Sequence, residues 1–260
     1  MPPRSSEAAQ RSASSRLVID GHTHIGLREI GSEYAYMGRL IPAKELIRSM
    51  DLNGITKALV WPMRQLGDYD SANRLVLQEG KRNPDRIIPF VRMNPWFEGS
   101  PERLKAYIAK GARGVKLHPA DENFSPDEKF VHPLMEIAEK ARIPVAVHTG
   151  GGSALPSLVG ELASRFPKVK VILLHLASYY DSSFVAHKCD NVYLETSQCL
   201  YLHRIAKMVV ENVGPDRVIW GSDFPYHYQE IERRKIELAG LRGDHLRLVL
   251  GGNLLQILGN

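Results

Sequence analysis

Five polar residues of this chain have side chains that can bind or use a divalent metal ion. They are His22, His24, His148, His175 and Asp223, and each lies where a short apolar run gives way to Gly, Pro or Ser. Neutral imidazoles and one carboxylate suit Zn²⁺ and related ions. Because His and Asp are poor strand formers and costly to bury without a partner, their shared position at strand ends favours a metal-dependent site.

The His-x-His triplet at residues 22–24 is weak evidence by itself, since a chain with ten His in 260 residues contains about 0.4 such triplets by chance. Its context, LVIDGHTHIG, adds an apolar run and a glycine before the triplet. Side chains of a strand repeat on one face every two residues, so His22 and His24 share a face and can reach one ion.

The other three residues follow similar runs. His148 ends the β-branched run of IPVAVHTG, His175 ends the run of VKVILLHLAS, and Asp223 ends RVIWGSDFPY. A single His of this kind is more often a satisfied residue of a strand or loop. The combination of all the segments therefore carries the prediction of a shared site.

Short apolar runs alternate with longer amphipathic stretches along the chain, which predicts βα units and a parallel sheet. The eight predicted strands are 17–20, 56–61, 87–93, 114–117, 144–147, 169–174, 192–195 and 217–220. The predicted helices between and after them are 43–52, 71–82, 101–109, 127–141, 155–166, 182–188, 203–212 and 229–238, and residues 245–258 are expected to add one or two short helices.

Periodicity does not distinguish a closed barrel from an open, doubly wound sheet, but the candidate ligands do. They follow predicted strands one, five, six and eight, whereas an open sheet collects its ligands at a switch point between two strands. Only a closed barrel brings the carboxyl ends of those four strands around one point. The predicted fold is therefore a (β/α)8 TIM barrel.

Composition restricts the class of protein. A chain of 260 residues with 43% hydrophobic residues fits one barrel domain, predicted for residues 17–260, and the small polar residues 1–16 are expected to form a disordered tail. The net charge of +5 comes from cations interspersed with acids, so no nucleic-acid partner is expected. No apolar run is long enough for a membrane span. Two cysteines, without a disulfide or thiolate-site spacing, favour the cytoplasm. A small-molecule substrate is the expected partner, and a homodimer is left open.

The chain resembles the amidohydrolase superfamily, in particular the amidohydrolase-related (amidohydrolase 2) branch of hydrolases and decarboxylases. The resemblance runs from about Val18 to Leu258 and is carried by DGHTHIG, GVKLHP, VAVHTG, VILLHLA, VIWGSDFP and GGNLLQILG. It implies one divalent ion, commonly zinc, held by His22, His24, His148 and Asp223. It also implies a catalytic role for His175 beside the ion.

Two residues of GVKLHP have alternative roles. Lys116 and His118 lie two residues apart and share a face of the fourth predicted strand. In binuclear members of the superfamily, a carboxylated lysine on this strand bridges two metals, and Lys116 could do the same. In the branch that this chain resembles most, a single ion is usual, which we favour, and Lys116 or His118 would contact the substrate. A structural lysine paired with Asp or Glu is the third alternative for Lys116.

The predicted chemistry is hydrolysis of an amide, lactone or ester bond. A bound ion can lower the pKa of water from about 15.7 to near 7, Asp223 would move the proton, and His175 would polarise the substrate carbonyl. Arg64, Arg92 and Tyr226 are weaker candidates for substrate binding, and Glu195 could orient a ligand histidine. The alternatives are non-oxidative decarboxylation in the same site, a metal-free lactonase, and a non-catalytic barrel that acts as a binding protein.

Overall fold

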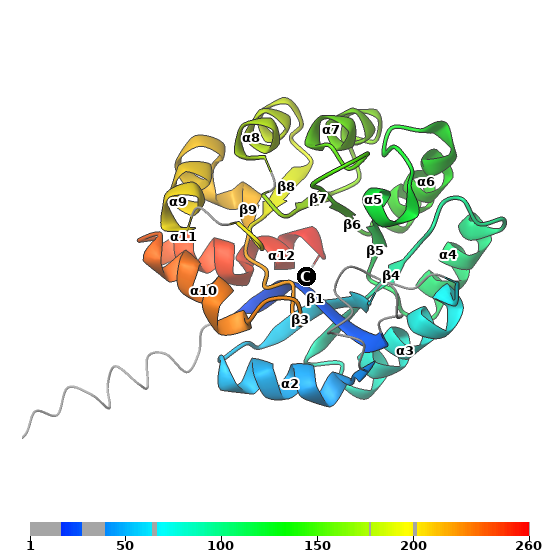
Figure 1. The fold of residues 1–260 in the computed structure, drawn as a ribbon, viewed down its shortest axis with the longest axis horizontal. Helices are drawn as coiled ribbons and strands as arrows, with labels where there is room; N and C mark the ends of the chain where they lie inside the picture. The colour runs from blue at the N-terminus through cyan, green and yellow to red at the C-terminus, as the bar shows by residue number, and fades with distance from the viewer. Residues whose placement is uncertain (1–16, 28–39, 64–66, 177, 200–201, 260) are drawn as a thin grey trace, which may run out of the picture.

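The computed structural model describes residues 17–27, 40–63, 67–176, 178–199 and 202–259, and its centre is a nine-stranded sheet that curls into a barrel (Figure 1). The strand order is β2-β1-β3-β4-β5-β6-β7-β8-β9, and every neighbouring pair is parallel except β1 and β2. The bounds are β1 Ile19–Leu27, β2 Leu40–Ile41, β3 Lys57–Pro62, β4 Ile87–Arg92, β5 Gly114–Leu117, β6 Val145–His148, β7 Val171–Leu174, β8 Val192–Glu195 and β9 Val218–Ile219. The tail predicted for residues 1–16 lies outside the described residues.

Helices follow the strands and surround the sheet (Figure 1). They are α2 Ala43–Leu52, α3 Tyr69–Arg82, α4 Ser100–Ala109, α5 Pro119–Glu122, α6 His132–Ala141, α7 Pro156–Arg165, α8 Tyr179–Lys188, α9 Leu202–Val213, α10 Gln229–Leu238, α11 Gly243–Arg247 and α12 Asn253–Ile257. No helix in these parts of the chain is long and apolar enough to cross a membrane.

The barrel closes where the segment that follows β9 runs beside β1. The backbone N–H of Gly21 donates to the carbonyl of Trp220 at 3.1 Å, and that of His24 donates to the carbonyl of Phe224 at 2.8 Å. The N–H of Asp223 in turn donates to the carbonyl of His22 at 2.8 Å. The predicted (β/α)8 barrel is confirmed, and closure places His22, His24 and Asp223 on neighbouring segments.

Two apolar layers hold the barrel, as the two-residue repeat of strand side chains requires. Leu59 and Trp61 of β3 belong to a buried cluster inside the barrel, whereas Ala58 and Val60 belong to the larger cluster that also contains the buried faces of the helices. Leu254 and Ile257 of α12 join the inner cluster, and α12 lies across the middle of the barrel in Figure 1. The C-terminal segment therefore supplies part of the barrel core.

A buried carboxylate reinforces the closure. Asp20 accepts hydrogen bonds from the backbone N–H of Ser222 at 2.9 Å, from its hydroxyl at 2.6 Å, and from Gln229 Nε2 at 2.8 Å. The backbone N–H of His22 also donates to it at 3.1 Å. Burial raises the pKa of Asp20 to about 6, although these hydrogen bonds oppose the shift. The cluster joins β1 to the loop that carries Asp223.

The structure differs from the sequence prediction at several boundaries. β1 extends to Leu27, so His22 and His24 lie within the strand, while β2 and the four-residue α5 were not predicted. The helix predicted from residue 127 begins at His132, because Pro133 fits the first turn of a helix and residues 129–131 form a separate turn. None of these shifts changes the barrel.

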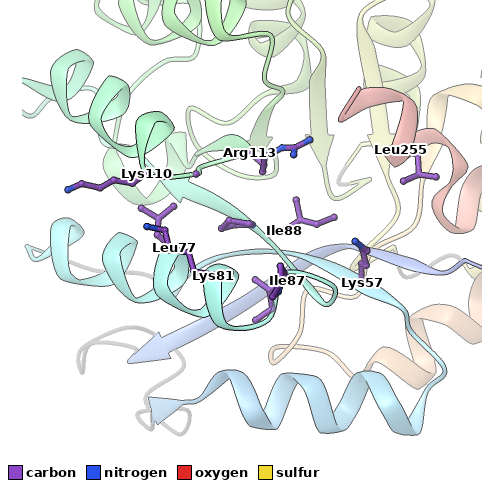
Figure 2. A pocket seen from close by; sticks show the side chains of 12 residues that line it. Lys57, Leu77, Lys81, Ile87, Ile88, Lys110, Arg113 and Leu255 are labelled. Atoms are coloured by element: carbon purple, nitrogen blue, oxygen red, sulfur yellow. The ribbon is translucent and has the colours of Figure 1, made fainter. Parts of the chain in front are cut away.

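A pocket opens at the amino-terminal end of the barrel, opposite the end that carries the histidines. Lys57 and Ile87, which begin β3 and β4, line it together with Leu255 of α12 (Figure 2). Lys110 and Arg113 also line the pocket, but Figure 2 shows them extending in opposite directions. This pocket contains none of the predicted site residues.

Candidate metal centre

Two imidazole nitrogens and one carboxylate oxygen meet at the carboxyl ends of the strands. His22 Nε2 and His24 Nε2 lie 2.9 and 3.0 Å from Asp223 Oδ1, and 3.2 Å from each other. The side chains are 1%, 6% and 4% exposed. The structure therefore brings together three of the four predicted ligands in a buried cluster.

Hydrogen bonds to the other ring nitrogens fix the two histidines. His22 Nδ1 lies 3.0 Å from Glu195 Oε2, and His24 Nδ1 lies 3.2 Å from the carbonyl of Pro62. Because both partners are acceptors, each Nδ1 carries a proton and donates it. In the neutral rings, the Nε2 atoms then direct lone pairs into the cluster, in agreement with the indole N–H of Trp61, which donates to His24 Nε2 at 3.3 Å. The predicted orienting contact of Glu195 is present.

A cation fits this donor set. Two imidazole lone pairs and an ionised oxygen repel one another at about 3 Å unless a positive charge lies between them. Ligand atoms around tetrahedral Zn²⁺ are about 3.3 Å apart when the bonds are about 2.0–2.1 Å, close to the separations in the cluster. Donor type, tautomer and spacing are therefore those of a site for a divalent ion.

The pKa values in the cluster reflect the same attraction for positive charge. Burial alone would lower the pKa of His22, but the charge of Asp223 and hydrogen bonds to Asp223 and Glu195 raise it above its usual value. Burial alone would raise the pKa of Asp223, but His22 holds it well below its usual range. Burial lowers the pKa of His24 to about 4.

His175 and His148 form a second part of the site. A nitrogen of His175 lies within 4.8 Å of ligand atoms of His22 and Asp223, and these three residues form a candidate metal group. His148 is connected through His175, because its Nδ1 lies 3.0 Å from His175 Nε2. Burial, reinforced by neighbouring positive charges, holds the pKa of both rings well below the usual range, so both are neutral at pH 7.

Lys116 is buried at the end of β5, with its ammonium 5.1 Å from the centroid of the Trp61 ring. No ion pair joins Lys116 to a carboxylate within the described parts of the chain. This does not favour the third alternative, a structural lysine paired with Asp or Glu. Burial, followed by the positive charge of Arg92, lowers its pKa to about 7.

We expect the Lys116→Met variant to unfold at a higher temperature than the wild type at pH 7. The pKa of Lys116 falls from 10.5 in the unfolded chain to about 7 in the folded one. Between these values the unfolded state binds more protons, so the free energy of unfolding of the wild type rises with pH. The advantage of the variant should therefore shrink toward pH 10, as scanning calorimetry can measure. An unchanged melting temperature in Lys116→Met, with the exposed Lys110→Met as control, would contradict the buried charge.

His118 and Arg92 have other partners. The ring of His118 stacks on His148, with centroids 3.8 Å apart, and its Nδ1 accepts a hydrogen bond from the N–H of Asp121 at 3.1 Å. Arg92, which is 2% exposed, donates through Nε to Glu122 and through Nη2 to Asp121, both at 2.7 Å. These two carboxylates neutralise the positive charge of Arg92, a residue that the sequence suggested for binding an anionic substrate.

Of the two remaining residues predicted to bind substrate, Tyr226 lies within the described parts of the chain and Arg64 does not. Tyr226 lies edge-on to His24, with ring centroids 5.3 Å apart, so it borders the cluster. Arg64 lies outside the described residues. Their roles in substrate binding stay predictions.

Sequence reasoning missed the residues that follow β8. Ser197 hydrogen-bonds both carboxylate oxygens of Glu195, and Gln198 Nε2 donates to Asp223 Oδ2, the oxygen on the other side from the histidines. His175, Gln198 and Asp223 all have left-handed backbone, with φ of 59°, 59° and 58°. Such strain is common at functional sites. A run of polar residues directly after Glu195 was the available signal.

Gly221 permits the close contact between Glu195 and His22. A Cβ atom at this position would lie 2.5 Å from Glu195 Oε1 and 2.8 Å from His22 Cβ. Any side chain would therefore displace the carboxylate that fixes His22.

Glu195→Gln is expected to weaken binding of a divalent ion about 10- to 100-fold, because the partner that orients His22 loses its charge. Competition with a chelator would measure the dissociation constant. The exposed Glu161→Gln on α7 provides the control. An affinity equal to that of wild type would show that Glu195 does not support the ligand.

Comparison with known proteins identifies the family of the chain and agrees with the barrel fold. The family model described as amidohydrolase matches residues 19–257, and the chain belongs to this family. It is therefore an enzyme of the amidohydrolase type. The search of curated proteins finds no match.

Solved structures share the fold at low sequence identity. The 5-carboxyvanillate decarboxylase of Sphingomonas paucimobilis is 18% identical, with a TM-score of 0.77, over 94% of this chain and 99% of that chain. The corresponding enzyme of Novosphingobium aromaticivorans, in complex with manganese and a nitrobenzoic acid, is 16% identical, with a TM-score of 0.76, over 95% and 97%. A probable 2-pyrone-4,6-dicarboxylic acid hydrolase of Acinetobacter baumannii is 16% identical, with a TM-score of 0.70, over 94% and 99%.

Proposed function

We propose that this protein is a metal-dependent hydrolase that cleaves an amide, lactone or ester bond of a small molecule, with carboxylated molecules as one candidate class. The observation that carries the proposal is the inward-facing donor set of His22, His24 and Asp223, whose atoms lie 2.9–3.2 Å apart in a buried cluster. Membership of the amidohydrolase family supports it.

One divalent ion would be held by His22, His24, His148 and Asp223. The nitrogen-rich donor set fits Zn²⁺, which we propose as the native metal, although a manganese complex is known for a structural neighbour. When bound, the ion acts as a Lewis acid and acidifies water. A second ion bridged by carboxylated Lys116 is the less favoured alternative.

Asp223 and His175 would do the proton chemistry. Asp223 would accept a proton from the attacking water and deliver it to the leaving group, because its Oδ1 faces the cluster while Gln198 holds Oδ2. His175, within 4.8 Å of the same ligand atoms, would contact the substrate. The buried Lys116 and Trp61 would border the bound molecule and limit the access of bulk water.

A decarboxylase is the second candidate, favoured by the 5-carboxyvanillate decarboxylases among the structural neighbours. That reaction needs a group that recognises the departing carboxylate and a proton donor to carbon. Arg92 was the candidate for the first role, but its ion pairs with Asp121 and Glu122 favour hydrolysis over decarboxylation.

Metal analysis of the purified protein, followed by assays with 2-pyrone-4,6-dicarboxylate and 5-carboxyvanillate, tests the two candidates together. The hydrolase predicts a bound divalent ion and ring opening of the pyrone without release of carbon dioxide. Release of carbon dioxide from 5-carboxyvanillate would establish the decarboxylase instead. If the purified protein contains no metal and keeps full activity in the presence of a chelator, both metal-dependent proposals are overturned.

We further propose a cytoplasmic location, supported by two buried cysteines that are free thiols. A homodimer is proposed as the assembly, and sedimentation would test it. The proposed substrate is a small molecule. Because cations and acids are interspersed along the sequence, we propose no nucleic-acid partner.

A further inference from the structure

A chain of hydrogen bonds connects Glu195 to His148 through two intermediate side chains. Ser197 Oγ lies 2.7 Å from Glu195 Oε2, His175 Nδ1 lies 2.9 Å from Ser197 Oγ, and His148 Nδ1 lies 3.0 Å from His175 Nε2. Glu195, Ser197 and His175 are at most 4% exposed. Each contact has the length of a hydrogen bond.

The direction of the first contact is fixed by the carboxylate. Oε2 of Glu195 already faces two N–H donors, His22 Nδ1 at 3.0 Å and the backbone N–H of His175 at 3.3 Å, as the oxygen of an ionised carboxylate does. An ionised carboxylate only accepts, so the single proton of the Ser197 hydroxyl points to Glu195. The backbone N–H of Ser197 donates to the other carboxylate oxygen at 2.6 Å and holds the serine in place.

The remaining protons follow in order. Because the hydroxyl of Ser197 has used its only proton, His175 Nδ1 must donate to Ser197 Oγ. A neutral imidazole has one ring proton, so His175 Nε2 is an acceptor, and the hydrogen bond of 3.0 Å makes His148 Nδ1 its donor. His148 Nε2 is then the ring nitrogen with a free lone pair.

We propose that Ser197 is a positioning residue that sets the tautomers of His175 and His148, so that His148 Nε2 is presented as a metal ligand. The role of the His148 Nε2 lone pair as a metal ligand rests on the proposed metal-dependent function. The tautomers of His175 and His148 follow from the hydrogen bonds and do not depend on that function. They also distinguish the two histidines, because His175 Nε2 already accepts a proton from His148 and is not free to coordinate.

The plane of the His148 ring is held separately. His118 stacks on it at an angle of 13°, and the N–H of Asp121 donates to His118 Nδ1. Arg92 fixes Asp121 through an ion pair of 2.7 Å. The relay therefore selects which nitrogen of His148 is free, while the stack limits rotation of its ring.

Nitrogen-15 NMR of the histidine side chains in metal-free protein tests the tautomers directly. Signals are assigned from the His148→Gln and His175→Gln variants. We expect both His148 and His175 of the wild type to carry their proton on Nδ1. A proton on Nε2 of either ring would overturn the relay, and this measurement requires no variant of Ser197.

The Ser197→Ala variant tests the role of the serine. We expect His175 to lose its single Nδ1–H tautomer and the dissociation constant for Zn²⁺ to rise about 10- to 100-fold. Ser183→Ala is the matched control, because this buried serine has no hydrogen-bond partner for its hydroxyl within the described residues. Unchanged tautomers in folded Ser197→Ala protein would contradict the proposal.

The outcomes separate the relay from the proposed function. If wild-type protein binds no Zn²⁺ but shows the two Nδ1–H tautomers, the relay stands and the metal-dependent function fails. If it binds Zn²⁺ while either metal-free ring carries Nε2–H, the function stands and the relay fails.

Discussion

Asp223→Asn is expected to lower kcat/KM about 10³-fold, which is the usual scale for loss of a general acid–base group. Asparagine has nearly the same shape, and Gln198 can still approach it, but the amide cannot take the proton of the attacking water. Its oxygen also lacks the charge that faces His22 and His24 at 2.9 and 3.0 Å. Steady-state kinetics at saturating Zn²⁺ would measure the loss.

Measurement of bound metal separates the two roles of Asp223. If the variant holds the ion and fails to turn over, the carboxylate acts on protons, whereas lost metal indicates a ligand role. The exposed Asp216→Asn should behave as wild type. An Asp223→Asn enzyme that retains more than a few per cent of the wild-type rate at saturating metal would place the chemistry elsewhere.

His22→Ala is expected to reduce bound metal from about one equivalent per chain to below about a tenth. The substitution removes the nitrogen that lies closest to Asp223 Oδ1 and leaves Glu195 without one of its donors. Ser197 still donates twice to that carboxylate, so the fold should persist at a lower melting temperature. Elemental analysis after gel filtration measures the metal, and circular dichroism checks the fold.

The control for this variant is His187→Ala, which replaces an exposed histidine of α8. It should keep both metal and activity. Wild-type metal content in His22→Ala would mean that the ion binds through a set of residues that does not include His22.

The fold was predictable because its signals are local. Each apolar run and each amphipathic stretch is set by neighbouring residues, and the two-residue repeat correctly placed His22 and His24 on one face. Glu195 was predictable as an orienting group for the same reason, since it ends a strand beside the candidate ligands. The two-residue β2 and the short α5 carry too few residues for a periodic signal.

The partners of the site residues were not predictable, because they depend on contacts between distant segments. Arg92 suggested an anion-binding side chain, but Asp121 and Glu122 meet it from 29 and 30 positions away. His118 suggested a contact with the substrate, and in the structure its ring stacks on His148. Neither contact follows from strand or helix periodicity.

The closure of the barrel has a consequence for the order of events during synthesis. His24 and Asp223 are 199 positions apart, and Asp20 is fastened to the segment carrying Asp223 through Ser222 and Gln229. On the proposed ligand set, a nascent chain offers three imidazoles long before it offers the carboxylate. The ion would then be secured only once the last strand has left the ribosome and docked, so metal loading would mark a finished chain.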